Sequence, residues 1–460
     1  MPITRRLLLV LTVSLAVVVP PRASTHAFDV VLNAQGEFMD AYLVNGTALP
    51  PKVVFIDPDP PNPDILGTPP RVGRHVNGKL CFFPRGGGLT GKFVVADDTY
   101  RESCLDRNPP QARCSVTRRS SRFYVGKDPD GWAVFRRSGK WTKRHIHTPW
   151  PGFAETPQGT PPPDAPQGNI DPQGCVFDGR GNFFATDVGS GDPTDQNPNH
   201  RGSLLVFFPG RRHRYDTFCF LDKNLKQAGM PAMDEAGNIY VPETGGLKVS
   251  KYSPPFPSSP ADCPNADHLV TTPPTKAVFP TPGALTPSSI VRVPHTDHWY
   301  VASVIVPFPG GIINEYDANG VLVRNIVPTN MLKNPLGMDV GSDGTVYYAE
   351  LNLNPDFSTG CGRVSMARFV GGTPQAPEIL GKNLSFPDGV TVVDSSQLRV
   401  NFLKLPPAPE PDPRTCNGEG SPSGAFIDGS PFAGCTRGTS GGPFPTAVAA
   451  ARRARRRPRR

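Results

Sequence analysis

GCVFDGRGNFFATD, residues Gly174–Asp187, holds the unit that decides the fold: a small residue, a short apolar run, a turn, and a second strand that ends in an acid. The unit returns as GMPAMDEAGNIYVPE (Gly229–Glu243) and GMDVGSDGTVYYAE (Gly337–Glu350). Looser copies are SIVRVPHTDHWYVAS (Ser289–Ser303) and GVTVVDSSQLRVNF (Gly389–Phe402). In chain order the five copies begin at residues 174, 229, 289, 337 and 389, which are 55, 60, 48 and 52 residues apart. Short strands separated by turns and repeated about every fifty residues are typical of β-propeller blades.

Earlier segments contain weaker versions of the same unit. Two strands are expected around the glycines at 86–88, and a hairpin is expected about one period before Gly174, at Arg122–Phe135. Units between residues 75 and 405 therefore predict an all-β, six-bladed β-propeller; a seventh blade would need strands from residues 28–56. We favour six blades, with these N-terminal strands pairing with the last unit, because an open ring would leave a free strand edge.

Three regions of different composition are predicted along the chain. Residues 1–27 combine Arg5 and Arg6 with an apolar run at Leu7–Val19, which indicates an export signal, and a retained membrane anchor is the alternative. Residues 28–405 are assigned to the propeller. Residues 406–460 are rich in Pro, Gly and Ser and are expected to be a disordered tail that ends in an arginine cluster. The chain is thus expected to be secreted or periplasmic.

The net charge of +8 is concentrated at the ends of the chain. Seven arginines lie in Arg452–Arg460 and three in the first 27 residues, so the remaining body carries about −2. A nucleic-acid-binding domain carries its positive charge on the folded surface, so no specific nucleic-acid partner is expected. The basic tail could contact anionic surfaces, and the body is expected to be a monomer.

Nine cysteines in an exported chain suggest disulfides. Cys104 with Cys114, and Cys416 with Cys435, could each close a local loop. Cys175 and Cys219 fall within one repeat. An odd count leaves at least one thiol over, and the pairing stays open at this point.

The stretch GNIYVPETGGLKVSKYSP, Gly237–Pro254, resembles an NHL repeat, and GNFFATD, GKFVVAD and GTVYYAE look like the same strand in other units. The same pattern resembles the senescence-marker/gluconolactonase propellers. This resemblance extends over most of residues 75–405. It implies a β-propeller, usually of six blades, and it does not imply one activity, because a single fold supports many functions.

Gluconolactonase-like relatives hold a metal ion through residues just before the glycine that opens each innermost strand. The matching positions in this chain are Gln173, Ala228, Ser288, Leu336 and Asp388. Only the PDG segment that contains Asp388 matches that motif well. Calcium takes six to eight oxygen ligands. Asp388 and Gln173 are therefore the candidate ligands for calcium or another divalent cation, within an otherwise poor set of donors.

Two functions from different classes follow. The first is a binding or interaction module that uses the central upper face, where the candidate residues are Asp171, Gln173, Ser288, Asn334 and Asp388. Its ligand would be an exported protein, a small molecule or a carbohydrate. The alternative is a metal-dependent hydrolase of the lactonase or esterase type, with Asp388 and Gln173 as ligands and Glu37 as a further donor. Whether the chain is an enzyme stays open. No G-x-S-x-G elbow surrounds Ser190, Ser203, Ser303 or Ser365, and the glycines at 86–88 form no phosphate-binding loop.

Three further groups of residues have a structural and a functional interpretation. The acids that end equivalent strands either bind cations or cap turns, and we favour turn caps: Asp97, Asp187, Glu243 and Glu350. Six histidines could either form a metal site or lie apart on the surface, and we favour the surface interpretation. They are His145, His147, His200, His213, His295 and His298. Tryptophans could line a groove or fill the layers between blades, which we favour: Trp132, Trp141, Trp150 and Trp299.

Overall fold

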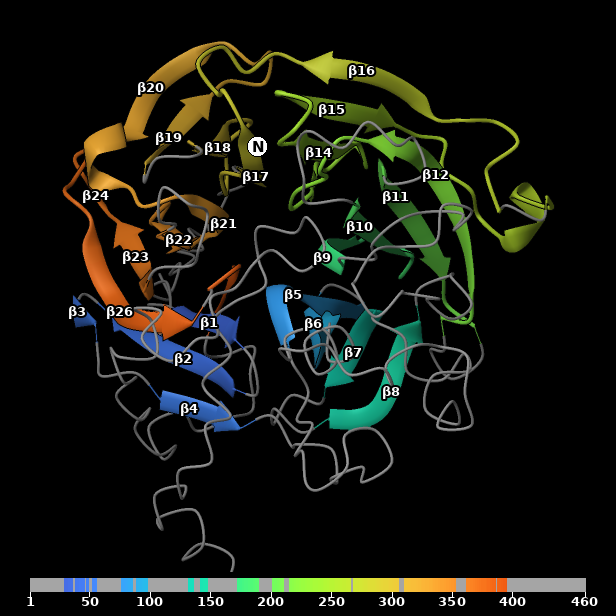
Figure 1. The fold of residues 1–460 in the computed structure, drawn as a ribbon, viewed down its shortest axis with the longest axis horizontal. Helices are drawn as coiled ribbons and strands as arrows, with labels where there is room; N and C mark the ends of the chain where they lie inside the picture. Colours follow the sequence, from blue (N-terminus) through green and yellow to red (C-terminus); the bar gives the residue numbers. More distant parts are fainter. Residues whose placement is uncertain are drawn as a thin grey trace, which may run out of the picture.

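The computed structural model of this chain describes residues 29–35, 38–45, 47–48, 52–55, 76–85, 88–97, 131–135, 141–147, 172–189, 201–210, 215–265, 268–305, 310–352, 361–385 and 387–394. The predicted export signal (1–27) and the predicted tail (406–460) lie outside these residues. The regular structure of these described residues consists of strands and two short 3-10 helices, η4 (Pro260–Asp262) and η5 (Thr329–Met331). The sheets surround a common centre in a propeller-like arrangement, so the all-β prediction is confirmed (Figure 1).

Five four-stranded sheets follow one another along the chain. Sheet I contains β5 (Val76–Arg85), β6 (Gly88–Asp97), β7 (Gly131–Phe135) and β8 (Trp141–His147). Sheet II contains β9 (Pro172–Phe177), β10 (Phe183–Gly189), β11 (Arg201–Phe208) and β12 (Thr217–Leu225). Sheet III contains β13 (Ala232–Met233), β14 (Ile239–Glu243), β15 (Lys248–Ser253) and β16 (Thr275–Phe279).

Sheet IV contains β17 (Pro287–Arg292), β18 (Trp299–Val304), β19 (Gly311–Tyr316) and β20 (Leu322–Val327). Sheet V contains β21 (Pro335–Val340), β22 (Val346–Glu350), β23 (Cys361–Ala367) and β26 (Glu378–Ser385). A small hairpin of β24 (Phe369–Val370) and β25 (Thr373–Pro374) joins the last two of these strands. Neighbouring strands are antiparallel, and the first strand of each sheet lies nearest the centre (Figure 1).

The closing sheet joins the two ends of the described chain. It contains β27 (Val390–Asp394), β1 (Asp29–Gln35), β2 (Phe38–Asn45), β3 (Thr47–Ala48) and β4 (Lys52–Phe55). The first strand of the chain pairs antiparallel with the last, from Asp29 opposite Asp394 to Asn33 opposite Val390. The expectation that N-terminal strands pair with the last unit is confirmed, and the number of blades stays a prediction.

The second strands of sheets II to V are fully buried. Every residue is buried in β10, β14, β18 and β22. A strand buried on both faces needs apolar residues at successive positions, which explains the runs NFFATD, NIYVPE and TVYYAE. The apolar cores accordingly lie between adjacent sheets rather than in one central mass.

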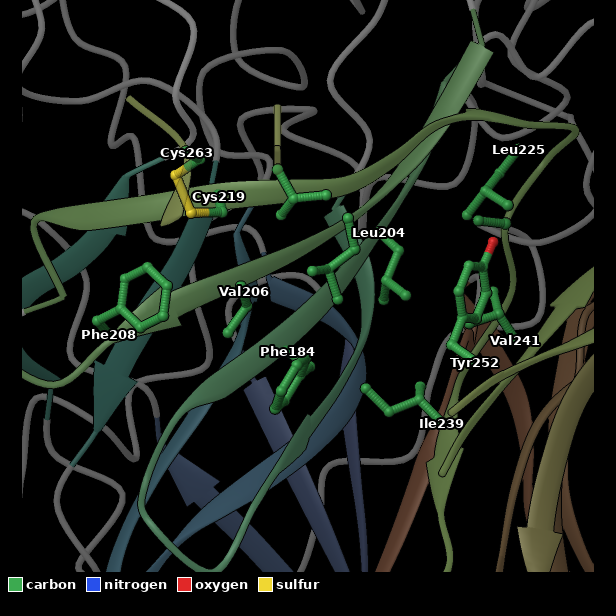
Figure 2. Close-up of a cluster of buried hydrophobic side chains, with 13 residues drawn as sticks. Phe184, Leu204, Val206, Phe208, Cys219, Leu225, Ile239, Val241, Tyr252 and Cys263 are labelled. Atoms are coloured by element: carbon green, nitrogen blue, oxygen red, sulfur yellow. A yellow bond between two sulfur atoms is a disulfide. The ribbon is translucent and has the colours of Figure 1, made fainter. Parts of the chain in front are cut away.

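The core between sheets II and III illustrates this packing. Phe184, Leu204 and Val206 of sheet II meet Ile239 and Val241 of sheet III (Figure 2). The core between sheets III and IV contains packed aromatic rings. There the Tyr240 and Trp299 rings lie 4.1 Å apart. The interpretation of tryptophan as an inter-blade filler is confirmed for Trp299, and the side chains of Trp132, Trp141 and Trp150 lie outside the described residues.

Adjacent sheets are also joined by hydrogen bonds near the centre. The Thr186 hydroxyl of sheet II donates to the Gly229 carbonyl, which precedes sheet III, at 2.8 Å. The Thr244 hydroxyl donates to the Pro287 carbonyl of sheet IV, also at 2.8 Å. The Thr391 hydroxyl of the closing sheet donates to the carbonyl of Leu80 in sheet I, at 3.0 Å. These bonds join neighbouring sheets and satisfy buried carbonyl groups.

Among the described residues, one disulfide links two adjacent sheets and another links sheet II to the segment between β15 and β16. Cys81 of sheet I is bonded to Cys175 of sheet II, and Cys219 of sheet II is bonded to Cys263 beside η4. Cys175 and Cys219, which share a repeat, are therefore each bonded to a cysteine outside it. Cys104, Cys114, Cys416 and Cys435 lie outside the described residues. Disulfides indicate an oxidising extracellular or periplasmic environment. Within the described ranges, no helix is long and apolar enough to cross a membrane.

Candidate functional site

The predicted site residues gather where the innermost strands begin, and we call this end of the ring the upper face. Gln173 lies in β9 and Ser288 in β17, while Asn334 and Asp388 come just before β21 and β27. The sheets repeat one strand order, so the starts of their innermost strands lie at the same end of the ring. Asp171 lies outside the described residues. The role of these residues as a binding site stays a prediction.

Gln173 and Asp388 contact each other directly. The Gln173 amide nitrogen donates to Asp388 Oδ1 at 3.3 Å, and both side chains are buried. Gln173 belongs to sheet II and Asp388 precedes the closing sheet, so the bond passes over sheet I, which lies between them in the ring. The bond therefore ties the closing sheet to a sheet that is not its neighbour.

Ser288 and Asn334 direct their polar groups into the ring. The Ser288 hydroxyl lies 3.0 Å from the Pro335 carbonyl oxygen and 3.3 Å from that of Ala302. The Asn334 amide donates to the Ile305 carbonyl at 2.9 Å. Asn334 also has a left-handed backbone with φ of 58°, which asparagine tolerates better than most residues. Ser288 thus bonds the innermost strand β21, and Asn334 bonds the backbone that follows β18.

These residues are a poor match to a divalent-cation site. Asp388 supplies the sole carboxylate among the five positions predicted from the lactonase resemblance, and Gln173 directs its N–H toward that carboxylate. Ala228 and Leu336 occupy two equivalent positions and are buried apolar residues. In the described part of the chain, no three His, Cys, Asp or Glu side chains cluster as metal ligands would. A hard cation needs more oxygen donors than this set provides.

Segments of different sheets approach one another closely at Gly337, which opens its repeat. A methyl group placed on Gly337 would lie 2.5 Å from Met230 Sδ and 2.7 Å from the Asp388 carbonyl oxygen. Met230 comes from the segment before β13 and is buried. The small residue that opens each repeat is therefore needed because strands from different sheets meet here without room for a side chain.

Two of the strand-end acids hold the loop that enters their own sheet. Glu350 accepts a hydrogen bond from the Lys333 backbone N–H at 2.7 Å and from the Ser365 hydroxyl at 2.8 Å. The Arg363 guanidinium lies opposite and also donates to it. A buried carboxylate is stable when several donors and a cation surround it.

Glu243 repeats this arrangement in sheet III. It accepts from the Lys226 backbone N–H at 3.3 Å and the Ser250 hydroxyl at 2.5 Å, and the Lys248 ammonium lies 3.6 Å away. The turn-capping interpretation is confirmed for Glu243 and Glu350. The serine on the third strand was missed by the sequence analysis, although it stands two residues beyond the basic residue in both copies. Asp187 accepts the Gly189 N–H at 2.8 Å, while the Asp97 side chain lies outside the described residues.

The histidines do not form a common site among the described side chains. His298 places Nδ1 2.6 Å from Glu315 Oε1, whose other oxygen binds Arg324. His145 and His147 lie on β8, and their side chains are outside the described residues. His200 and His213 are themselves outside the described residues. His295 lies in the turn before β18 with φ of 62°. His298 therefore belongs to an ion-pair network with Glu315 and Arg324.

A second charged network lies between the outer strands of sheets II and III. Asp222 on β12 accepts from the Lys276 ammonium and the Tyr252 hydroxyl, each at 2.8 Å. Burial raises the pKa of Asp222, but the hydrogen bond and charge of Lys276 and the N–H of Asn224 outweigh it, so the pKa lies below its usual 3.8. Burial and the Asp222 charge raise the pKa of Tyr252, which keeps its hydroxyl as a donor.

No protein-family model matches this chain, and no curated protein matches it. Solved structures of similar shape include a chain from a nidogen/laminin complex, with 11% identity and a TM-score of 0.44 over 79% of this chain and 98% of that one. A putative 6-phosphogluconolactonase from Bacteroides fragilis has 11% identity and a TM-score of 0.40 over 81% and 99%. A gluconolactonase from Xanthomonas campestris has 10% identity and a TM-score of 0.38 over 68% and 75%. No conclusion about activity follows from likeness at this level.

Replacing Gly337 by alanine tests the close approach at the axis. The added methyl must displace Met230 or the backbone near Asp388, so we expect Gly337→Ala to lower the free energy of unfolding by roughly 1–3 kcal/mol. Gly179→Ala is the matched control, because a methyl there meets nothing within 4 Å. Urea denaturation of both variants measures the difference. Equal stability of the two variants would show that the axis is not tightly packed.

Replacing Asp222 by asparagine tests the charged network between sheets II and III. Because the folded pKa lies below 3.8, the carboxylate stabilises the fold fully above that pH and loses its effect as the pH falls below it. We expect Asp222→Asn to cost roughly 1–3 kcal/mol at pH 7 and progressively less below pH 3.8. Melting temperatures from pH 7 to pH 3 check this. A difference that does not change with pH would refute the assignment.

Proposed function

We propose that this protein is an exported, six-bladed β-propeller that acts as a binding module through its upper face. The close packing at Gly337 and the Gln173–Asp388 bond are the observations that carry the proposal. Met230 packs against Gly337, and Gln173 is bonded to Asp388, so the groups expected to line an axial catalytic pocket are used in holding the ring together. Recognition is then left to side chains and loops around the rim of this face.

Exposed leucines on the upper face support a protein partner. Leu247, in the turn between β14 and β15, is 63% exposed, and Leu285, just before β17, is 64% exposed. The Thr244–Pro287 hydrogen bond brings the two loops side by side. Large exposed apolar side chains that lie close together are typical of protein interaction sites.

The backbone of Leu247 strengthens this assignment. Its φ of 56° lies in the left-handed region, which is costly for leucine and natural for glycine. Two glycines directly precede it, so the turn itself needs no leucine side chain at this position. A strained, exposed apolar residue is best explained by a contact that the side chain makes with a partner. An exported protein is therefore the favoured ligand, ahead of a small molecule or a carbohydrate.

Substitution of the leucines separates binding from stability. We expect Leu247→Gly to keep or raise the melting temperature, since it relieves the strained φ, and to reduce capture of exported partners at least tenfold. Leu285→Ser should reduce capture in the same way. Val278→Ser is the matched control, because Val278 is 61% exposed but lies on the outer strand β16. The readout is the amount of each exported protein retained by immobilised variants.

Two results would contradict the binding function. Retention that is equal for the wild type, Leu247→Gly and Val278→Ser would show that the leucines are not part of an interface. Turnover of a lactone or ester that disappears in Asp388→Ala, while the fold is kept, would favour the metal-dependent hydrolase instead. Metal content of the purified protein accompanies this assay, because that alternative needs a Lewis acid.

A further inference from the structure

Sheet IV departs from its neighbours at the position of the strand-end acid. Backbone hydrogen bonds align sheets III, IV and V: in each, the residue after this position donates to a carbonyl of the segment that leads into the innermost strand. These bonds are Thr244 N to Gln227 O, Val304 N to Thr286 O, and Leu351 N to Asn334 O, each 3.0 Å long. Ser303 of sheet IV therefore occupies the position held by Glu243 in sheet III and Glu350 in sheet V.

The basic residue opposite the acid is missing from sheet IV as well. Glu243 faces Lys248 and Glu350 faces Arg363, whereas Ser303 faces Ile312. The backbone N–H equivalent to those of Lys226 and Lys333 is that of Leu285. The loop that enters sheet IV therefore lies where the loops that enter sheets III and V lie. Sheet IV lacks both the acid that binds this loop and the basic residue opposite the acid.

Two hydroxyl groups lie at this position without hydrogen-bond partners. Ser303 is fully buried, and neither its Oγ nor Oγ1 of Thr286 has a partner within the described residues. A buried hydroxyl that makes no hydrogen bond destabilises the fold, so such groups normally bind an ordered oxygen atom. The two residues belong to directly paired segments, since Ser303 is in register with Pro287, the next residue after Thr286.

We propose that Ser303, Thr286 and the N–H of Leu285 form a polar binding site on the upper face of sheet IV, which we call the Ser303 site. Its ligand is a neutral oxygen, either a water molecule or the hydroxyl group of an alcohol or sugar. A carboxylate is disfavoured because Ile312 replaces the cation that a buried anion needs. The proposal does not depend on the partner of the two exposed leucines.

Crystal structures of the full chain test the ligand directly. In crystals grown without polyol, we expect one ordered water oxygen within hydrogen-bond distance of both Ser303 Oγ and Thr286 Oγ1. In crystals soaked in glycerol, a glycerol hydroxyl in its place identifies an alcohol site, and a retained water identifies a water site. The proposal is overturned if both hydroxyls donate to protein carbonyls and no ordered oxygen lies between them.

Transplanting the missing charges gives an independent test. We expect Ser303→Glu to lower the melting temperature, because the buried carboxylate has no cation opposite it. The double variant Ser303→Glu/Ile312→Arg should recover most of that loss, since it recreates the Glu350–Arg363 pair of sheet V. Ile312→Arg alone completes the double-mutant cycle. A double variant no more stable than Ser303→Glu would show that this position cannot take an oxygen ligand in the manner of its neighbours.

Discussion

The pairing of β1 with β27 is the constraint on which the rest of the structure depends. Each sheet buries its two faces against neighbouring sheets, so a ring that failed to close would expose two apolar faces and a free strand edge. The first strand of the chain prevents this by adding itself to the last, in register from Asp29 to Asn33. The Thr391–Leu80 bonds then join this composite sheet to sheet I.

Closure also determines what the centre of the ring can do. Strands that converge on the axis leave no room for side chains at their opening residues, as the contacts around Gly337 show. The polar side chains that remain there serve the ring, with Gln173 bonded to Asp388 and Ser288 bonded to Pro335. Chemistry on the axis would compete with these bonds. Binding at the rim, where Leu247 and Leu285 are exposed, leaves them intact.

The repeat was sufficient to predict the all-β fold and the closing strands, because the spacing of Gly174, Gly229 and Gly337 reflects a blade-sized unit. The assignment of the upper-face residues to a binding site stays a prediction. Proximity of Gln173 and Asp388 follows from the topology, whereas the use of their polar groups depends on distances that no sequence pattern contains. The Cys81–Cys175 bond was also missed, since it joins residues 94 apart through contact between sheets. Similarly, the equivalence of Ser303 to Glu243 and Glu350 could not be predicted from the sequence, because it depends on the register of the backbone hydrogen bonds.

Hydrogen exchange of the backbone amides in β1 tests the closed ring most directly. If β1 is the strand that joins β27 to β2, its amides must exchange as slowly as those of β27 and within the range of the buried strand β10. Exchange of Asp29–Gln35 at the rate of an unfolded peptide, while β10 stays protected, would contradict the account, because the ring would then be open at the sheet on which every inter-sheet contact relies.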